Sequence, residues 1–273
     1  MTRAFVSLLM ACAVAHLVGC ASRPQGPPQD ETLARLVRAG ASAYDLERPD
    51  EAATQYRAAL TRARARDDAG AIADAGFNLA AAELRAGKSQ AAMATAQEVE
   101  AELARRGHAD HGFDLIIATA LYRMGNLAGA DRIASVLATN SDRQIADSAW
   151  FLRGLIADER GDRAVLQAAV ASVSPTADPA DVTELRARLD RDPALALKAV
   201  DLRRTALDYR GMARALALAA QLTSDPNAAA ELYLRAGRSA AAQGDATLGR
   251  TWLAKARDLA RDPALRAAAS RGP

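Results

Sequence analysis

The side chains with the greatest capacity for chemistry lie in one short run, His108-Ala109-Asp110-His111. Two imidazoles and a carboxylate are donors of the kind that bind Zn²⁺, and a bound zinc ion can activate water for hydrolysis. The run has no evident fourth donor and no evident second shell of supporting residues. We therefore interpret the run as a polar loop that leads into a helix. The alternative is that the protein is a metal-dependent envelope enzyme that uses His108, Asp110 and His111.

Other sequence patterns of catalytic sites are absent. The chain has no Gly-x-Ser-x-Gly, no Walker-type phosphate loop and no His-Glu-x-x-His. Of its two cysteines, Cys12 lies in an apolar N-terminal run, so a metal site built on a cysteine pair is not expected. We therefore expect a protein that is not an enzyme and that has no cofactor.

The elements that would position any site in this chain are helices. Half of the 273 residues are hydrophobic but only 4% are aromatic, and alanine, leucine and arginine dominate. These residues favour helices, and alanine lets helices approach closely. Stretches rich in β-branched and aromatic residues are scarce. The composition predicts an all-α fold.

The charge distribution argues against a nucleic-acid partner. The chain has 35 Lys and Arg against 33 Asp and Glu, a formal charge of +2, and the two signs are interspersed. A nucleic-acid-binding domain usually has a concentrated basic surface. We expect protein partners and no nucleic acid.

The N-terminus has the features of an export signal. Arg3 gives a positive start, and Ala4 to Val18 are almost wholly apolar, a run that is short for a membrane-spanning helix. The sequence Leu17-Val18-Gly19-Cys20 resembles a bacterial lipobox. That resemblance implies a signal peptide over 1–19, lipidation of Cys20, and a lipid anchor on the periplasmic face of the outer membrane. An ordinary secreted protein or an uncleaved anchor is the alternative.

A repeated pattern of small and larger apolar residues follows. It is clearest from Leu36 to Leu60, where Gly40 and Ala43 precede a turn at Glu47–Asp50, and Tyr56 and Ala59 follow it. This pattern resembles the tetratricopeptide repeat, a unit of two helices and about 34 residues. The chain is therefore similar to tetratricopeptide-repeat outer-membrane lipoproteins of Gram-negative bacteria. The resemblance implies a right-handed α-solenoid of about six helix pairs.

The repeats suggest a division of the chain into segments. Six units begin near Leu33, Ala73, His111, Asp147, Pro193 and Ala230. Asp-Pro pairs, which favour helix starts, fall near several boundaries. We expect a lipidated, Pro-rich tether over 20–31, four units over 32–172, a connecting segment with a short helix over 173–192, two units and a capping helix over 193–269, and a tail over 270–273.

The resemblance also implies a concave surface that is lined by the first helix of each unit. The fifth positions of the first four units are apolar: Val37, Phe77, Leu115 and Phe151. The twelfth and thirteenth positions supply Tyr44, Arg85, Tyr122 and Arg123. We expect these eight residues to bind a partner segment. Burial between helices is the alternative for the apolar residues, and a solvated helix face for the arginines.

These features together predict a membrane-anchored, non-catalytic scaffold in the periplasm. By resemblance, it would hold a peptide or helix of another envelope protein in its concave groove. Lipoproteins of this architecture include secretin pilotins of type IV pili, accessory subunits of the β-barrel assembly machine, and adaptors for cell-wall enzymes. A structural spacer without a specific ligand is a further alternative.

Overall fold

The computed structural model describes residues 30–108, 111–174 and 176–272, and only the backbone of His111. These residues form fourteen α-helices, which confirms the predicted all-α class. The helices are α1 (Glu31–Asp45), α2 (Pro49–Ala65), α3 (Ala69–Arg85), α4 (Ser89–Ala104), α5 (His111–Arg123), α6 (Leu127–Leu137), α7 (Arg143–Arg160), α8 (Arg163–Ser172), α9 (Pro179–Asp190), α10 (Pro193–Thr205), α11 (Tyr209–Leu222), α12 (Pro226–Ala242), α13 (Ala246–Leu259) and α14 (Pro263–Ser270).

Aspartate caps begin most of these helices. The Asp30 carboxylate accepts a hydrogen bond from the backbone N–H of Leu33 at 3.0 Å, and Asp68 accepts one from Ala71 at the same distance. All four Asp-Pro pairs of the sequence start a helix in this way, with the aspartate as N-cap and the proline as the first helical residue. Each such cap contributes about 1 kcal/mol.

The helices pack through small residues at their closest points. A Cβ atom on Gly40 of α1 would lie 2.7 Å from the Tyr56 ring of α2. At the equivalent point of α12, a Cβ atom on Gly237 would lie 3.0 Å from the carbonyl oxygen of Gly249 in α13. Ala80 and Ala118, which the repeat pattern places at the same position, are fully buried. The helix pairs therefore meet where the sequence predicts.

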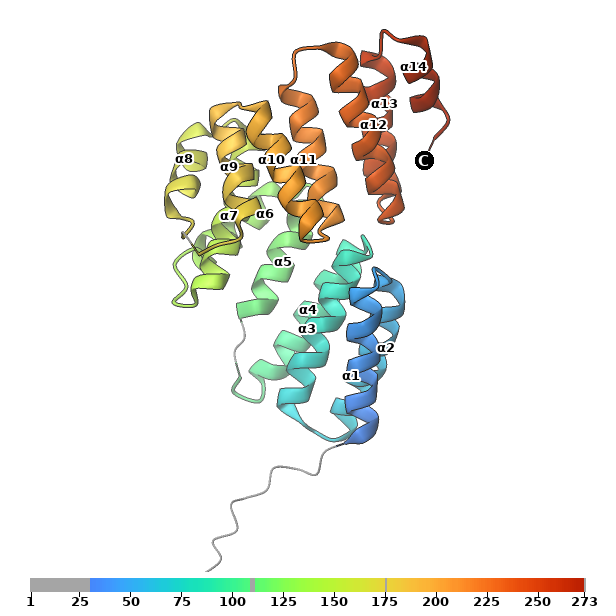
Figure 1. Ribbon diagram of the computed structural model, residues 1–273. Coiled ribbons are helices and arrows are strands. Elements are labelled where there is room, and N and C mark those ends of the chain that lie inside the picture. The colour runs from blue at the N-terminus through green and yellow to red at the C-terminus, as the bar shows by residue number, and fades with distance from the viewer. Residues whose placement is uncertain (1–29, 109–110, 175, 273) are drawn as a thin grey trace, which may run out of the picture.

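Consecutive helices pack against one another along the whole chain and form a tetratricopeptide-repeat-like solenoid (Figure 1). The first helices of neighbouring pairs also touch, since α3 packs on α5 and α5 on α7. The right-handed sense of the superhelix stays a prediction.

Helix α9 extends the packed core through the predicted connecting segment. It occupies most of the predicted connecting segment over 173–192, and it packs on α7 and α8 as well as on α10. The short helix expected in this segment is thus present, and it lies beside α7. The reason is burial: Leu185 and Glu184 of α9 are completely covered, so this helix belongs to the core.

The solenoid also closes on itself. The turn between α3 and α4 meets the turn between α12 and α13, where a Cβ atom on Gly87 would lie 3.7 Å from the carbonyl oxygen of Gly244. Arg210 of α11 joins both turns, because its Nη2 donates to the carbonyl oxygens of Arg85 at 2.6 Å and Gln243 at 2.8 Å. The junction brings together parts of the chain that are 125 positions apart.

The expected N-terminal features lie almost wholly outside the described residues. The signal peptide over 1–19, Cys20 and the tether up to residue 29 are not described, and α1 begins at Glu31. Within the described part of the chain, no helix combines the length and the apolar character needed to cross a membrane.

Candidate binding groove

A cavity of about 730 Å³ opens on the inner side of the solenoid. Side chains from α5, α7 and α9 line it together with side chains from α11, α12 and α13. We call this cavity the groove. Its charged lining consists of six basic residues, Arg123, Arg188, Arg191, Arg210, Arg214 and Lys255, and three acidic residues, Asp158, Glu159 and Asp245.

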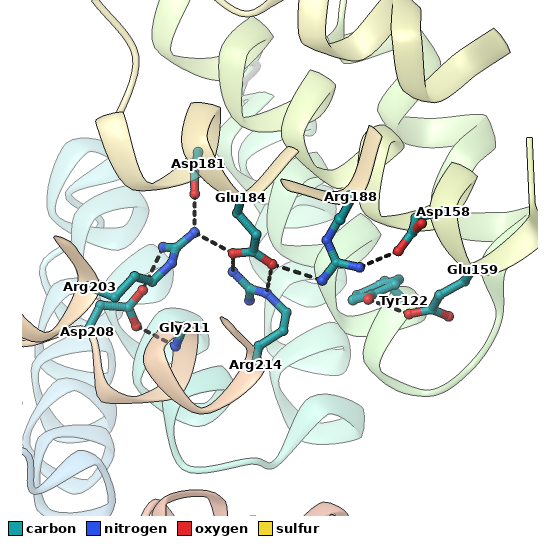
Figure 2. Close-up of polar contacts among 10 residues, drawn as sticks. All are labelled: Tyr122, Asp158, Glu159, Asp181, Glu184, Arg188, Arg203, Asp208, Gly211 and Arg214. Carbon is teal, nitrogen blue, oxygen red and sulfur yellow. Dashed lines mark hydrogen bonds and ion pairs between the residues drawn. The ribbon is translucent and has the colours of Figure 1, made fainter. Parts of the chain in front are cut away.

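A buried ionic network supports the groove wall (Figure 2). Its centre is Glu184 of α9, which has no exposed surface. The Glu184 carboxylate accepts hydrogen bonds from Arg188 at 2.9 Å, from Arg203 at 3.0 Å, and from Nε and Nη2 of Arg214 at 2.8 and 2.9 Å. One carboxylate therefore ties α9 to α10 and α11.

Further carboxylates surround the three arginines. Asp158 of α7 accepts from Arg188 at 2.6 Å, and Asp181 accepts from Arg203 at 2.5 Å (Figure 2). Asp208 accepts from Arg203 at 2.7 Å and also caps α11 through the N–H of Gly211. Every carboxylate in this set meets an arginine, which offsets part of the cost of burying the charges.

The network shifts the pKa values of its acids in opposite directions. Burial alone would raise the pKa of Glu184, but Arg214, Arg188 and Arg203 outweigh burial and hold its pKa well below the usual value. Burial raises the pKa of Asp181 to about 6, because Arg203 is shared with two other carboxylates and only partly compensates. Glu184 is thus a permanent charge of the site, whereas Asp181 titrates near neutral pH.

Two of the eight predicted binding residues line the groove, Tyr122 and Arg123. The Tyr122 hydroxyl donates to Glu159 at 2.5 Å, and burial together with this hydrogen bond raises its pKa. Arg123 donates to the carbonyl oxygen of Leu84 at 2.5 Å. Enclosure by the protein, and then repulsion from Arg210 and Arg214, lower the pKa of Arg123 to about 10, so it stays charged at neutral pH.

The other six predicted residues lie outside the groove lining. Val37 and Tyr44 are half-buried against the core of the first helices, and the guanidinium carbon of Arg85 lies 4.5 Å from the centre of the Tyr44 ring. Arg85 also forms an ion pair with Glu47. These contacts join α1 to α3, and the binding role of the three residues stays a prediction.

The remaining three are apolar residues that contact other helices. Phe77 is 37% exposed and meets Phe113 edge to face, with ring centres 6.0 Å apart. Leu115 packs on the core around Leu137 and Ala149. Phe151 lies under the ionic network, with the guanidinium carbons of Arg214 and Arg203 at 5.2 and 5.5 Å from its ring centre. All three contact other helices of this chain, and their binding role stays a prediction.

The candidate metal ligands are only partly described. His108 is exposed, whereas Ala109, Asp110 and the side chain of His111 lie outside the described residues. Among the residues that are described, no three His, Cys, Asp or Glu side chains come together as a metal site.

Most of the groove's charged residues were not expected from the sequence. The repeat pattern predicted a lining made by the first helix of each unit. Five basic residues of the lining instead belong to α9, to the turn after it, or to the second helices α11 and α13: Arg188, Arg191, Arg210, Arg214 and Lys255. The sequence did contain one signal for these residues, a spacing of four. Glu184 and Arg188 have this spacing, as do Arg210 and Arg214, and it places each pair on one face of a helix.

Comparisons with known proteins found similarity to solved structures at low sequence identity. No family model matches the chain, and no curated protein matches it. A tetratricopeptide repeat protein from Parabacteroides merdae is 15% identical, with 88% of this chain and 100% of that chain covered and a TM-score of 0.48. The TPR2AB domain of yeast Sti1, in its complex with pHSP90, is 16% identical, with 88% of this chain and 99% of that chain covered and a TM-score of 0.33. BtubC from P. vanneervenii is 15% identical, with 84% of this chain and 91% of that chain covered and a TM-score of 0.35. By its own helix packing, this chain is a tetratricopeptide-repeat-like solenoid.

Proposed function

We propose that this protein is a non-catalytic scaffold that binds a segment of another protein in the groove. The observation that supports this most directly is the groove itself, which is concave, about 730 Å³ in volume and lined by six helices. Binding sites for extended or helical segments are typically concave surfaces of this kind. A solenoid presents such a surface without any catalytic apparatus.

The groove is preorganised, which favours binding. Glu184 and its arginines fix α9 against α10 and α11, and Arg210 fixes the ends of α3 and α12 at the rim. A partner segment would therefore meet walls that are already ordered, and little conformational entropy would be lost by the scaffold on binding.

We also propose that a lipid on Cys20 holds the scaffold to the periplasmic face of the outer membrane. The support is the sequence around Cys20 and its distance from α1, which begins at Glu31. A Pro-rich spacer of this length spans at most about 30 Å. The solenoid would thus stay close to the membrane and within reach of other envelope proteins.

Site-specific crosslinking tests the scaffold function. A photoreactive residue replaces Thr251, which is exposed on α13 and lines the groove. The matched control is Thr205 of α10, an exposed threonine whose hydroxyl also donates to the carbonyl four residues earlier and which lies outside the groove. We expect a discrete crosslinked protein from position 251 alone. Equal capture from both positions would argue for a spacer without a specific ligand.

Removal of the lipid site tests the anchor separately. We expect Cys20→Ser to move the protein from the membrane fraction to the soluble fraction, because a chain without acyl groups has no comparable affinity for the bilayer. The intact mass of the wild-type protein should include the acyl chains. A wild-type protein that is recovered without lipid would refute the anchor and leave the scaffold function standing.

A further inference from the structure

The charges of the groove are unevenly neutralised. Six basic side chains face three acidic ones, and Glu184 behind the wall offsets one more positive charge. The groove therefore has an excess of two positive charges, as large as the +2 of the whole chain but concentrated in one cavity. A concave surface with one predominant sign of charge attracts the opposite sign.

The excess is found on particular side chains. Arg188 and Arg214 are matched by Glu184 and Asp158. Within the described part of the chain, no ion pair or hydrogen bond joins Arg123, Arg191 or Lys255 to a carboxylate, although Asp245 lies near enough to Arg123 to act on its pKa. Arg123 donates to a backbone carbonyl, and the Lys255 ammonium lies 5.4 Å from the centre of the Tyr233 ring. Arg191 is exposed in the turn after α9.

These three side chains come from separate places on the groove wall. Arg123 ends α5, Arg191 follows α9, and Lys255 lies on α13. All three line the same cavity. A ligand that satisfies them must therefore present several negative charges along its length, and a single small anion would leave most of them unmatched.

We propose that the segment bound in the groove is an acidic, extended stretch of a partner protein, whose carboxylates pair with Arg123, Arg191 and Lys255. This inference rests on the proposed scaffold function and specifies its ligand. Carboxylates spaced along a peptide can pair with the three cations, while neutral residues of the same peptide lie beside the acidic side chains of the lining, Asp158, Glu159 and Asp245. Such pairing fixes the register of the segment and speeds its association.

The wall is less suited to a nucleic acid. Asp158, Glu159 and Asp245 lie among the cations and would repel a continuous row of phosphates. Of the three aromatic residues of the lining, Tyr233 and Trp252 are only 6% and 8% exposed, and Tyr122 is half-buried with its hydroxyl bonded to Glu159. Tyr233 and Trp252 therefore offer no open face for base stacking, which leaves at most one ring, Tyr122, where single-stranded nucleic acids use a row of them.

The test measures binding of fluorescein-labelled decaglutamate to the full-length protein in detergent. The site variant is Arg191→Gln with Lys255→Gln. The control variant is Lys198→Gln with Arg235→Gln, which removes the same charge from exposed side chains outside the groove lining. We expect the site variant to weaken binding about four- to twenty-five-fold at low salt and the control to leave it nearly unchanged, since each exposed ion pair contributes a factor of about two to five.

The other arms separate the possible failures. Decaglutamine should bind much more weakly than decaglutamate, and added salt should weaken decaglutamate binding. Equal weakening by the site and control variants would overturn the inference, as would tighter binding of oligothymidylate. If the crosslink from position 251 persists in the Arg191→Gln, Lys255→Gln protein, the scaffold function stands and the acidic ligand is refuted. If no crosslink forms in the wild type, the scaffold function itself fails.

Discussion

Glu184 shows how one residue can organise the packing of several helices. It is completely buried, and its carboxylate accepts four hydrogen bonds from three arginines on α9, α10 and α11. A buried carboxylate is stable only with such partners, and the arginines depend on it in turn. The network therefore acts as a unit.

Neutralising this carboxylate should be strongly destabilising. We expect Glu184→Gln to lower the free energy of unfolding by about 3–5 kcal/mol, because three arginines would be left without their central charge. Asp201→Asn is the control, since Asp201 and its partner Arg204 are both exposed and such pairs contribute at most about 1 kcal/mol. Urea unfolding of both variants provides the comparison. Similar losses in the two variants would mean that the network contributes little.

Asp181 should make stability depend on pH. Its pKa is raised to about 6 from an unfolded value of 3.8, so the folded state binds more protons than the unfolded state between these values. The contribution of Asp181 is therefore most favourable below the unfolded pKa and is lost as the pH rises through 6. We expect Asp181→Asn to gain about 1–3 kcal/mol relative to wild type between pH 4 and pH 7. A difference that does not change with pH would refute the shift.

The effect of Glu184 on stability has the opposite pH dependence, and it occurs at lower pH than that of Asp181. Its pKa lies below the unfolded value of 4.5, so its contribution is present above that value and is lost as the pH falls below it. The pH profile of the Asp181→Asn protein should therefore keep the acid-induced loss of stability and lack only the slope between pH 4 and pH 6.

At the scale of the helices, local sequence explains much of the structure. Aspartate caps, proline at the first helical position and the small residues at Gly40, Ala80 and Gly237 are all readable from neighbouring residues, and all occur where expected. Each depends on interactions within one helix or between two consecutive ones, which is why a single repeat is enough to predict it.

The place of α9 was not predictable in the same way. Its position follows from the burial of Glu184 and Leu185 against α7, α10 and α11, and these contacts involve several helices at once. Once α9 lies beside α7, α11 reaches the groove and brings Arg210 and Arg214 with it. The repeat pattern could therefore predict that Tyr122 and Arg123 line the groove, but it could not predict that Arg210 and Arg214 do so as well.

The turn before α11 contains backbone strain that substitution can relieve. Leu207 has φ +57° and is 56% exposed, so its side chain contributes little packing while its backbone is left-handed. We expect Leu207→Gly to raise the free energy of unfolding by about 0.5–1 kcal/mol, because the left-handed conformation costs about 1–2 kcal/mol for other residues and part of that gain is lost to glycine's greater entropy when unfolded.

Leu46 is the matched control for this change. It is also an exposed leucine in a turn between paired helices, at 64% exposure, but its φ is −82°. Leu46→Gly should therefore destabilise the protein by about 0.5–1 kcal/mol, as glycine does where no special backbone is required. Thermal melts of the two variants should shift in opposite directions. Shifts of the same sign would show that φ at Leu207 is not the cause.

At the scale of the whole molecule, the closure between the two halves determines how the groove can be entered. The α3–α4 and α12–α13 turns meet through Gly87 and Gly244, and Arg210 and Arg123 donate to the carbonyl oxygens at the end of α3. These carbonyls carry the negative end of the α3 dipole, which favours a cation there. The junction is thus formed by two turns and by arginines from α5 and α11, in contrast to the helix-on-helix packing elsewhere.

Such a junction should open when its main donor is removed. Arg210→Ala eliminates two hydrogen bonds from a charged donor, each contributing about 1.5–3 kcal/mol. Because the α10–α11–α12 packing does not depend on these bonds, we expect the helix content to stay the same while the radius of gyration in X-ray scattering rises. Arg250→Ala on α13, whose guanidinium donates a hydrogen bond to Thr247 of the same helix, should leave the scattering profile unchanged. An Arg210→Ala protein that scatters like wild type would show that the two turns hold each other without the arginine, and that a partner segment must enter a groove that stays closed at this rim.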